Sequence, residues 1–93
     1  MRFSWDARKS AANPAARGFD FASLIFDGPT LEKEDRRRDY GERRVIAVGL
    51  AQGIALTVIY TDRLDAGEET ERRIISARRS NRHERQAFQE ALC

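Results

Sequence analysis

The chain has 93 residues, enough for one domain with a modest core, and we expect a single domain over residues 1–93. Its net charge of +2 excludes a strongly basic tail, although 15 of its 17 lysine and arginine residues are arginine. The sequence contains neither a run of about 20 apolar residues that could span a bilayer nor a signal peptide. Its single cysteine, Cys93, cannot form an intramolecular disulfide, which is typical of a reducing compartment. We therefore expect a cytoplasmic protein that does not enter a membrane.

The first 30 residues predict an edge strand followed by helices. Alternating aromatic residues make "RFSW" at 2–5 a candidate edge strand. The alanine-rich segment 7–17 predicts a helix, which Pro14 must kink or split. A second helix is expected to begin at Asp20, which can accept hydrogen bonds from its first N–H groups. The turn sequence "DGP" at 27–29 ends that helix.

The middle of the chain predicts a β-hairpin. Residues 31–42 are almost all charged and fit either an exposed edge strand or a loop. The runs "RRVIAVGL" (43–50) and "IALTVIYT" (54–61) are rich in β-branched residues and are joined by "AQG". We therefore expect two antiparallel strands connected by a tight turn.

The last part of the chain predicts one more strand and a helix. "RRIISAR" at 72–78 has strand composition, and Asn81 with Glu84 forms a capping-box pattern for a helix over 82–91. The resulting class is α+β. One or two N-terminal helices pack on a three- to four-stranded antiparallel sheet, and a C-terminal helix follows.

Alternation along the strands predicts a polar face of the sheet. If the bulkier residues pack against the helices, Ile46, Leu56, Val58 and Ile75 share the apolar face. The opposite face then collects hydroxyl and arginine side chains, namely Arg43, Thr57, Thr61, Arg63, Ser76 and Arg78. Arginine forks suit phosphate groups, so this face could meet a polyanion. The alternative is an ordinary solvated surface, with some arginines paired to Glu68, Glu69 or Glu71.

Several stretches together resemble one protein family. These stretches are "FSWDARKSAAN", "FDFASLIFDGP", "ERRVIAVG", "VIYTDR" and "RRIISARRSNRHER", and they resemble the BrnT-type toxins of bacterial type II toxin–antitoxin systems. The resemblance implies a fold like that of the RelE-type ribonucleases and RNA cleavage that inhibits translation and growth. It also implies a ribbon-helix-helix antitoxin that neutralises the toxin and represses the operon, so that operator DNA is reached only through the antitoxin.

The chain departs from that family at the end of its first predicted helix. Family members usually carry "K-H-G" there, whereas this chain reads Ala16, Arg17 and Gly18. This loss motivates an alternative, a non-catalytic toxin-like module that acts through antitoxin binding and autorepression. A plain RNA-binding domain is a third possibility, but the predicted sheet lacks exposed aromatic residues for base stacking.

Cleavage of RNA without a metal requires stabilisation of a charged phosphorane and transfer of two protons. We expect Arg43, Arg63 and Arg78 to stabilise the charge. His83, the only histidine, is the candidate for proton transfer, although it also fits an exposed helix position. Glu42 and Glu84 are further possible bases, with Glu84 better explained as a cap. Expected substrate-binding residues are Lys9, which matches the family's lysine, and Thr61, Ser76 and Arg79. Metal-ligand spacing is missing, so we expect no metal and no cofactor.

Overall fold

The computed structural model describes residues 2–5, 19–64 and 66–92. The predicted helix over 7–17, with Lys9, Pro14 and the "A-R-G" departure at 16–18, lies outside the described residues. Within the described part, no helix is both long and apolar enough to span a bilayer.

The sheet has five strands in the order β1-β5-β4-β3-β2. It is mixed, because β1 runs parallel to β5 while every other pair is antiparallel. The α+β class is confirmed, but the predicted three- to four-stranded antiparallel sheet is too small. The charged segment supplies an edge strand, and "RFSW" pairs in parallel. The strands are β1 (Arg2–Trp5), β2 (Leu31–Glu34), β3 (Val45–Ala51), β4 (Ile54–Leu64) and β5 (Thr70–Arg79).

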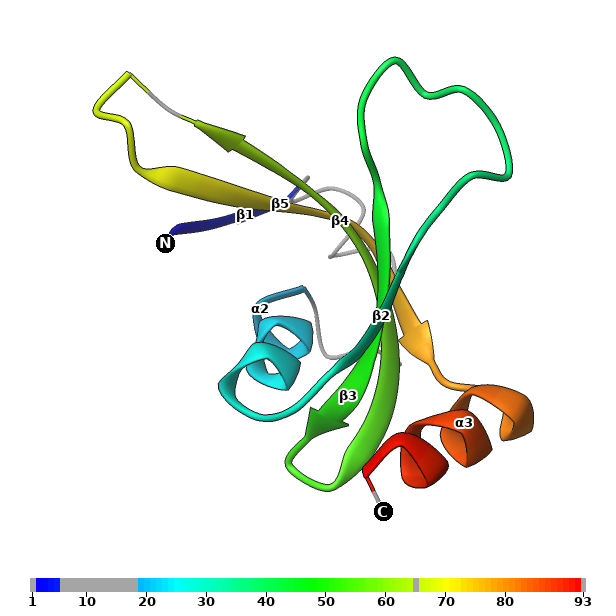
Figure 1. Ribbon diagram of the computed structural model, residues 1–93. Coiled ribbons are helices and arrows are strands. Elements are labelled where there is room, and N and C mark those ends of the chain that lie inside the picture. Colours follow the sequence, from blue (N-terminus) through cyan, green and yellow to red (C-terminus); the bar gives the residue numbers. More distant parts are fainter. Residues whose placement is uncertain (1, 6–18, 65, 93) are drawn as a thin grey trace.

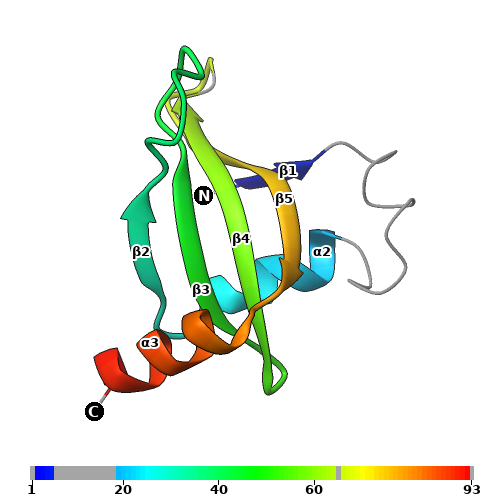
Figure 2. The ribbon, with the colours of Figure 1, turned by 90° about the vertical axis from the view of Figure 1, so that its right-hand side faces the viewer.

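Helices lie on both faces of this sheet (Figure 1). α2 (Phe19–Ala22) continues into the 3-10 helix η2 (Ser23–Asp27) on one face. α3 (Arg82–Leu92) lies on the other face, as the perpendicular view in Figure 2 also shows. The predicted cap Asp20 is part of α2, and the predicted C-terminal helix is confirmed.

The main core lies between the sheet and the α2–η2 segment. We call this the α2 side; the strands contribute Val45, Ala47, Ala51, Leu56, Val58, Tyr60, Ile74 and Ala77 to it, and all are buried. Ala22 and Ile25 fill it from the helical segment, and both are fully buried. Gly49 lets the two layers approach closely, because a Cβ atom there would meet the Cβ of Ile25 at 3.0 Å.

The hairpin turn decides which residues of β3 face this core. The turn is formed by Gln52 and Gly53, both with positive φ (49° and 82°). A two-residue turn of this kind matches the twist of the two strands. It pairs Ala51 with Ile54 and, further along, Ile46 with Ile59. A three-residue "AQG" connection would shift the register by one residue and put Ile46 on the same face as Val58. That is the predicted arrangement, and the observed register shows that it is wrong.

A bulge in β5 changes the phase of that strand as well. Ile59 pairs with Ser76, but the next residue, Tyr60, pairs with Ile74. Ile75 is the extra residue, and it is only half-buried. Ile74 occupies the core instead, with 1% of its surface exposed. The prediction that Ile75 packs in the core is therefore wrong, because strict alternation fails across a bulge.

An aromatic cluster fastens β1 to the rest of the α2 side. The ring of Phe3 stacks on Phe26, with centroids 5.6 Å apart, and Phe26 meets Tyr60 edge-on at 5.3 Å. The guanidinium of Arg72 lies 4.0 Å from the centre of the Tyr60 ring and is held by two bonds to Asp62. The edge strand is thus joined to the core by side chains as well as by its ladder.

Candidate functional site

The sheet face under α3 carries five of the six residues that were predicted to form the polar face. We call it the α3 side; its strand residues are Ile46, Val48, Thr57, Ile59, Thr61, Arg63, Ser76 and Arg78, in phase with one another in the observed register. The prediction that Arg63 and Arg78 share a face is confirmed. The prediction that this face is opposite to the helices is wrong, because α3 packs on it.

Arg43 and Arg79 do not belong to this side. Arg43 lines a small cavity with Val45, Tyr60 and Asp62, which are residues in the phase of the α2 side. The same one-residue shift of the hairpin explains why the sequence places Arg43 on the other face. Arg79 pairs with Leu56 and follows its phase.

Arg78 is bound by a carboxylate of α3. Its Nη1 and Nη2 atoms each donate to Glu84, both at 2.7 Å. Glu84 also accepts from the backbone N–H of Asn81 at 2.8 Å, while Asn81 accepts from the backbone N–H of Glu84 at 2.9 Å. This reciprocal pair is the predicted capping box, and it fixes the start of α3 beside the end of β5.

The paired charges set the protonation of both residues. The hydrogen bonds from Arg78 are the main reason that the pKa of Glu84 falls to about 2, with further bonds from Asn81 and Thr57. Glu84 in turn raises the pKa of Arg78. Both groups therefore stay charged at neutral pH. Beneath them, the buried hydroxyls of Thr57 and Ser80 share a hydrogen bond of 2.8 Å, which anchors the turn into α3.

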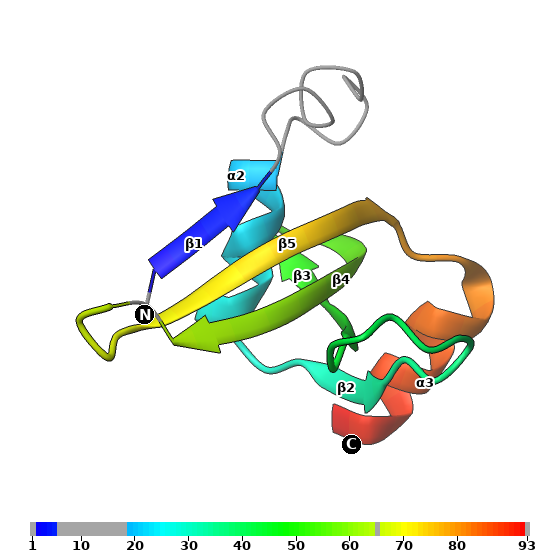
Figure 3. The same ribbon diagram turned by 90° about the horizontal axis from the view of Figure 1, so that it is seen from above.

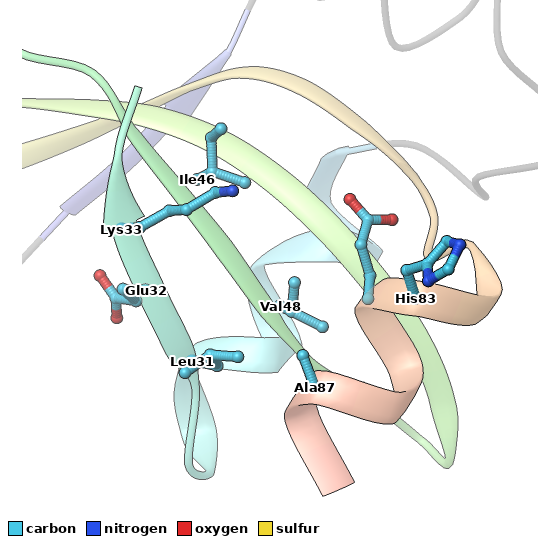
Figure 4. A pocket seen from close by; sticks show the side chains of 8 residues that line it. Leu31, Glu32, Lys33, Ile46, Val48, His83 and Ala87 are labelled. Atoms are coloured by element: carbon cyan, nitrogen blue, oxygen red, sulfur yellow. The ribbon is translucent and has the colours of Figure 1, made fainter. Parts of the chain in front are cut away.

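A pocket of about 400 Å³ opens next to this ion pair, between β2, β3 and the first turns of α3. Figure 4 shows Lys33 extending from β2 and His83 from α3, with Ile46 and Val48 of β3 between them. Its remaining lining residues are Leu31, Glu32, Glu84 and Ala87. The pocket thus has an apolar floor and a rim that carries a cation, an imidazole and a carboxylate.

Lys33 is a member of this site that the sequence analysis missed. It pairs with Ile46, so it shares the α3 side with that residue. Across the described residues, Lys33 makes neither an ion pair nor a hydrogen bond. The signal was the alternation in "LEKE", where Lys33 is in phase with Leu31. That alternation carries weight only if β2 is already known to be a strand.

A second ion-pair group lies at the other end of the α3 side. Glu42 accepts from Arg63 at 3.1 Å and from Arg44 at 3.3 Å. The guanidinium of Arg44 also lies 4.1 Å from the centre of the Tyr40 ring. Glu42 therefore holds two arginines in place.

The loop of residues 35–44, which we call the 35–44 loop, is organised by one buried carboxylate. Asp35 is 5% exposed and accepts from Nε and Nη2 of Arg37, both at 2.9 Å. It also accepts from the backbone N–H of Arg37 and from the hydroxyl of Tyr40. The bonds from Arg37 hold the pKa of Asp35 far below its ordinary value, and Asp35 raises the pKa of Arg37.

The remaining predicted residues have different surroundings. Thr61 is buried, and its hydroxyl donates to the carbonyl of Arg43 at 2.8 Å, so it ties β4 to the segment that leads into β3. Ser76 is half-buried on the α3 side. His83 is exposed on the first turn of α3. Among residues 2–5, 19–64 and 66–92, no three His, Cys, Asp or Glu side chains are grouped to hold a metal ion.

Comparison with known proteins identifies a family for nearly the whole chain. The family model described as "Ribonuclease toxin, BrnT, of type II toxin-antitoxin system" matches residues 5–84. No curated protein and no solved structure matches the chain. The matched range includes both strands of the hairpin, all of β5 and the residues Arg78, His83 and Glu84.

Proposed function

Because the chain belongs to the BrnT family of ribonuclease toxins of type II toxin–antitoxin systems, we propose that it is an endoribonuclease that cleaves RNA on the α3 side. One observation carries this location. Lys33 of β2 and His83 of α3 line one pocket, and Glu84, which also lines it, binds Arg78 of β5. This combination supplies fixed positive charge and an imidazole that can donate or accept a proton.

The proposed reaction uses side chains alone. The 2′-hydroxyl attacks the adjacent phosphorus, and the 5′-oxygen leaves with a proton. Arg78 stabilises the charge that develops on the phosphorane, because Glu84 holds its guanidinium in one orientation before RNA binds. His83 moves the protons, and Lys33 binds a phosphate oxygen. Arg63 contacts the RNA strand farther along. Arg43 and Arg79 have no role in this reaction, because they follow the phase of the α2 side.

The partner of such a toxin is an antitoxin. That it is of the ribbon-helix-helix type, and that operator DNA is reached only through it, are part of this proposal and follow from the family resemblance. The mild net charge of +2 supports the division of labour, because affinity for DNA comes mainly from cations that neutralise phosphates. The likeness to RelE-type ribonucleases is likewise proposed, on the grounds of an α+β fold with helices on an antiparallel β3–β4–β5 unit.

A second candidate function is a toxin-like module without catalysis. Two observations favour it. The chain carries Ala16 and Arg17 where the family usually has lysine and histidine. Moreover, Arg78 already has a carboxylate partner. In this case the protein acts by forming the antitoxin complex and by repressing the operon.

The decisive experiment combines growth arrest with cleavage of purified RNA. We expect Arg78→Ala to lose growth arrest and to cut RNA a few hundred-fold more slowly, because one donor to a transition-state anion is worth about 3–4 kcal/mol. The matched control is Arg79→Ala, which removes the same side chain one residue away on the other side of the sheet. It should keep full activity.

Melting temperatures measured alongside separate catalysis from folding. Loss of the partly exposed Arg78–Glu84 pair should cost only about 1 kcal/mol of stability. The proposed mechanism is wrong if Arg78→Ala stays fully toxic, or if Arg79→Ala loses as much activity. A wild-type chain that binds its antitoxin but cuts no RNA supports the second candidate.

A further inference from the structure

Arginines of the 35–44 loop and of β5 are held in the same way. Arg37 binds Asp35 through Nε and Nη2, and Arg78 binds Glu84 through Nη1 and Nη2. Each carboxylate occupies one edge of a planar guanidinium and leaves further N–H groups available. Both arginine side chains are more than half exposed (67% and 56%), while their carboxylates are 1% and 19% exposed. The carboxylates orient the arginines without covering them.

The 35–44 loop lies on the same side of the sheet as the proposed RNA site. In Figures 1 and 3 the loop extends over the same side of the sheet that α3 covers. Glu84 raises the pKa of Arg78, and the positive charge of Arg37 opposes this in part. Two arginines that carboxylates orient thus belong to the same side of the sheet, and an anion bound between or beside them would relieve their mutual repulsion.

The surroundings favour a strand of phosphates over a single small anion. Lys33 lies at the pocket, and Arg63 and Arg44 lie at the far end of the same side. Positive groups are therefore distributed along the α3 side from the loop to α3. A row of phosphodiesters bound by separate cations matches this distribution, because single-stranded nucleic acid is tracked through its backbone.

We infer that the 35–44 loop forms a second wall of the RNA site, in which Arg37, positioned by Asp35, binds a phosphodiester of the strand whose neighbouring part lies against Arg78. This inference rests on the proposed function, because it takes the α3 side to be where RNA lies. Asp35 touches no RNA. Its part is to hold the guanidinium of Arg37 in a fixed plane, so that little side-chain freedom is lost when phosphate binds.

The test measures binding of a single-stranded oligonucleotide made of 2′-O-methyl RNA, whose attacking hydroxyls are blocked. Arg37→Gln should weaken binding about tenfold, as expected for the loss of a charged hydrogen bond. It should also reduce the slope of log affinity against log salt by about 0.7, the value for one phosphate contact on a single strand. The matched control is Arg38→Gln, which removes the same charge from the next residue, an exposed one. It should weaken binding less than threefold.

The role of Asp35 is tested by a double variant. Asp35→Asn keeps the charge of Arg37 but loosens its orientation, so we expect weaker binding with a salt slope close to that of the wild type. In an Arg37→Gln background the same change should weaken binding no further, because Asp35 acts through Arg37. If Arg37→Gln melts below the assay temperature, Arg37→Lys takes its place; it keeps the charge but lacks the fork, and should lose affinity without losing slope.

The outcomes separate this inference from the proposed function. Equal weakening by Arg37→Gln and Arg38→Gln overturns the inference alone, since the wild type still binds and cuts RNA. A wild-type chain that binds the oligonucleotide through Arg37 but cuts no RNA overturns the proposed cleavage and leaves the binding site standing. A wild-type chain that neither binds nor cuts RNA overturns both.

Discussion

Glu84 has two structural duties at the scale of single residues. Its carboxylate caps the first turn of α3 through the N–H of Asn81, and it orients Arg78. A neutral side chain of the same shape can perform the first duty but not the second, because glutamine also serves in capping boxes. The residue therefore offers a way to separate the charge of this carboxylate from its position.

We predict that Glu84→Gln flattens the acid side of the stability profile. The folded-state pKa of Glu84 is about 2, below the ordinary value of 4.5, so the unfolded chain takes up its proton first as the pH falls. The stabilisation is complete above about pH 5 and is lost between about pH 5 and pH 2. Because Arg78 is more than half exposed, this stabilisation should amount to about 1 kcal/mol.

Urea unfolding between pH 7 and pH 2 measures this effect. Between about pH 5 and pH 2, the free energy of unfolding of the variant should fall by about 1 kcal/mol less than that of the wild type. Asp35, whose pKa is lowered by Arg37, keeps part of the acid sensitivity in both proteins. Glu90→Gln, in the exposed last turn of α3, is the control. Identical profiles for Glu84→Gln and the wild type would show that the ion pair does not survive in solution.

Residue-level predictions from sequence worked where the interaction is local. The capping box was readable because Asn81 and Glu84 are three residues apart and need only a helix between them. The Asp35–Arg37 bond is equally local, but the sequence places three arginines in succession at 36–38 and does not indicate which one binds Asp35. Lys33 was missed because its role depends on the pairing of β2 with β3, which is a tertiary fact.

At the scale of elements, the close contact between η2 and β3 depends on Gly49. We predict that Gly49→Ala destabilises the fold by about 1–3 kcal/mol, the usual cost of overpacking. The added methyl group would lie 3.0 Å from the Cβ of Ile25 and 3.1 Å from Cγ2 of Thr30, so these neighbours must give by a few tenths of an ångström. Gly28→Ala is the control, because a Cβ atom there meets nothing within 4 Å. Thermal or urea unfolding of both variants gives the comparison, and equal stabilities would mean that η2 shifts freely.

The sequence predicted which strands and helices form, but not which face of the sheet their residues occupy. The hairpin, the last strand and the C-terminal helix all form where the pattern indicated. A turn that is one residue shorter than expected then moved Ile46 and Arg43 to the opposite faces. A bulge exchanged Ile75 for Ile74 in the core. Turn length and bulges are set by φ values and by packing across the sheet, and neither leaves a strong trace in composition.

At the scale of the whole molecule, the two faces of the sheet are unequally supported. The α2 side has a continuous buried core drawn from three strands and the α2–η2 segment. Of the residues in α3, Phe88 alone is buried, and it is not part of that core cluster. The helix that carries His83 and Glu84 is therefore attached by less apolar contact than the rest of the fold.

We predict that α3 opens as a unit below the free energy of global unfolding. Native-state hydrogen exchange should show lower opening free energies for α3 amides than for those of β4. Leu56→Ala, on the α2 side, should lower protection in β4 by about 2–5 kcal/mol and leave α3 unchanged. Phe88→Ala should lower protection in both, because it destabilises the docked state relative to every open state. If α3 and β4 exchange with the same free energy in the wild type, the helix has no independent opening.

The parallel pairing of β1 with β5 also has a consequence for how the protein is made. Residues 2–5 are synthesised well before their ladder partners, residues 71–74. Strand pairs so far apart in sequence form slowly and only after the intervening chain is present. Arg78 and His83 emerge later still, after most of the sheet has been synthesised. The proposed RNA site on the α3 side can therefore assemble only after β5 and α3 have both been synthesised.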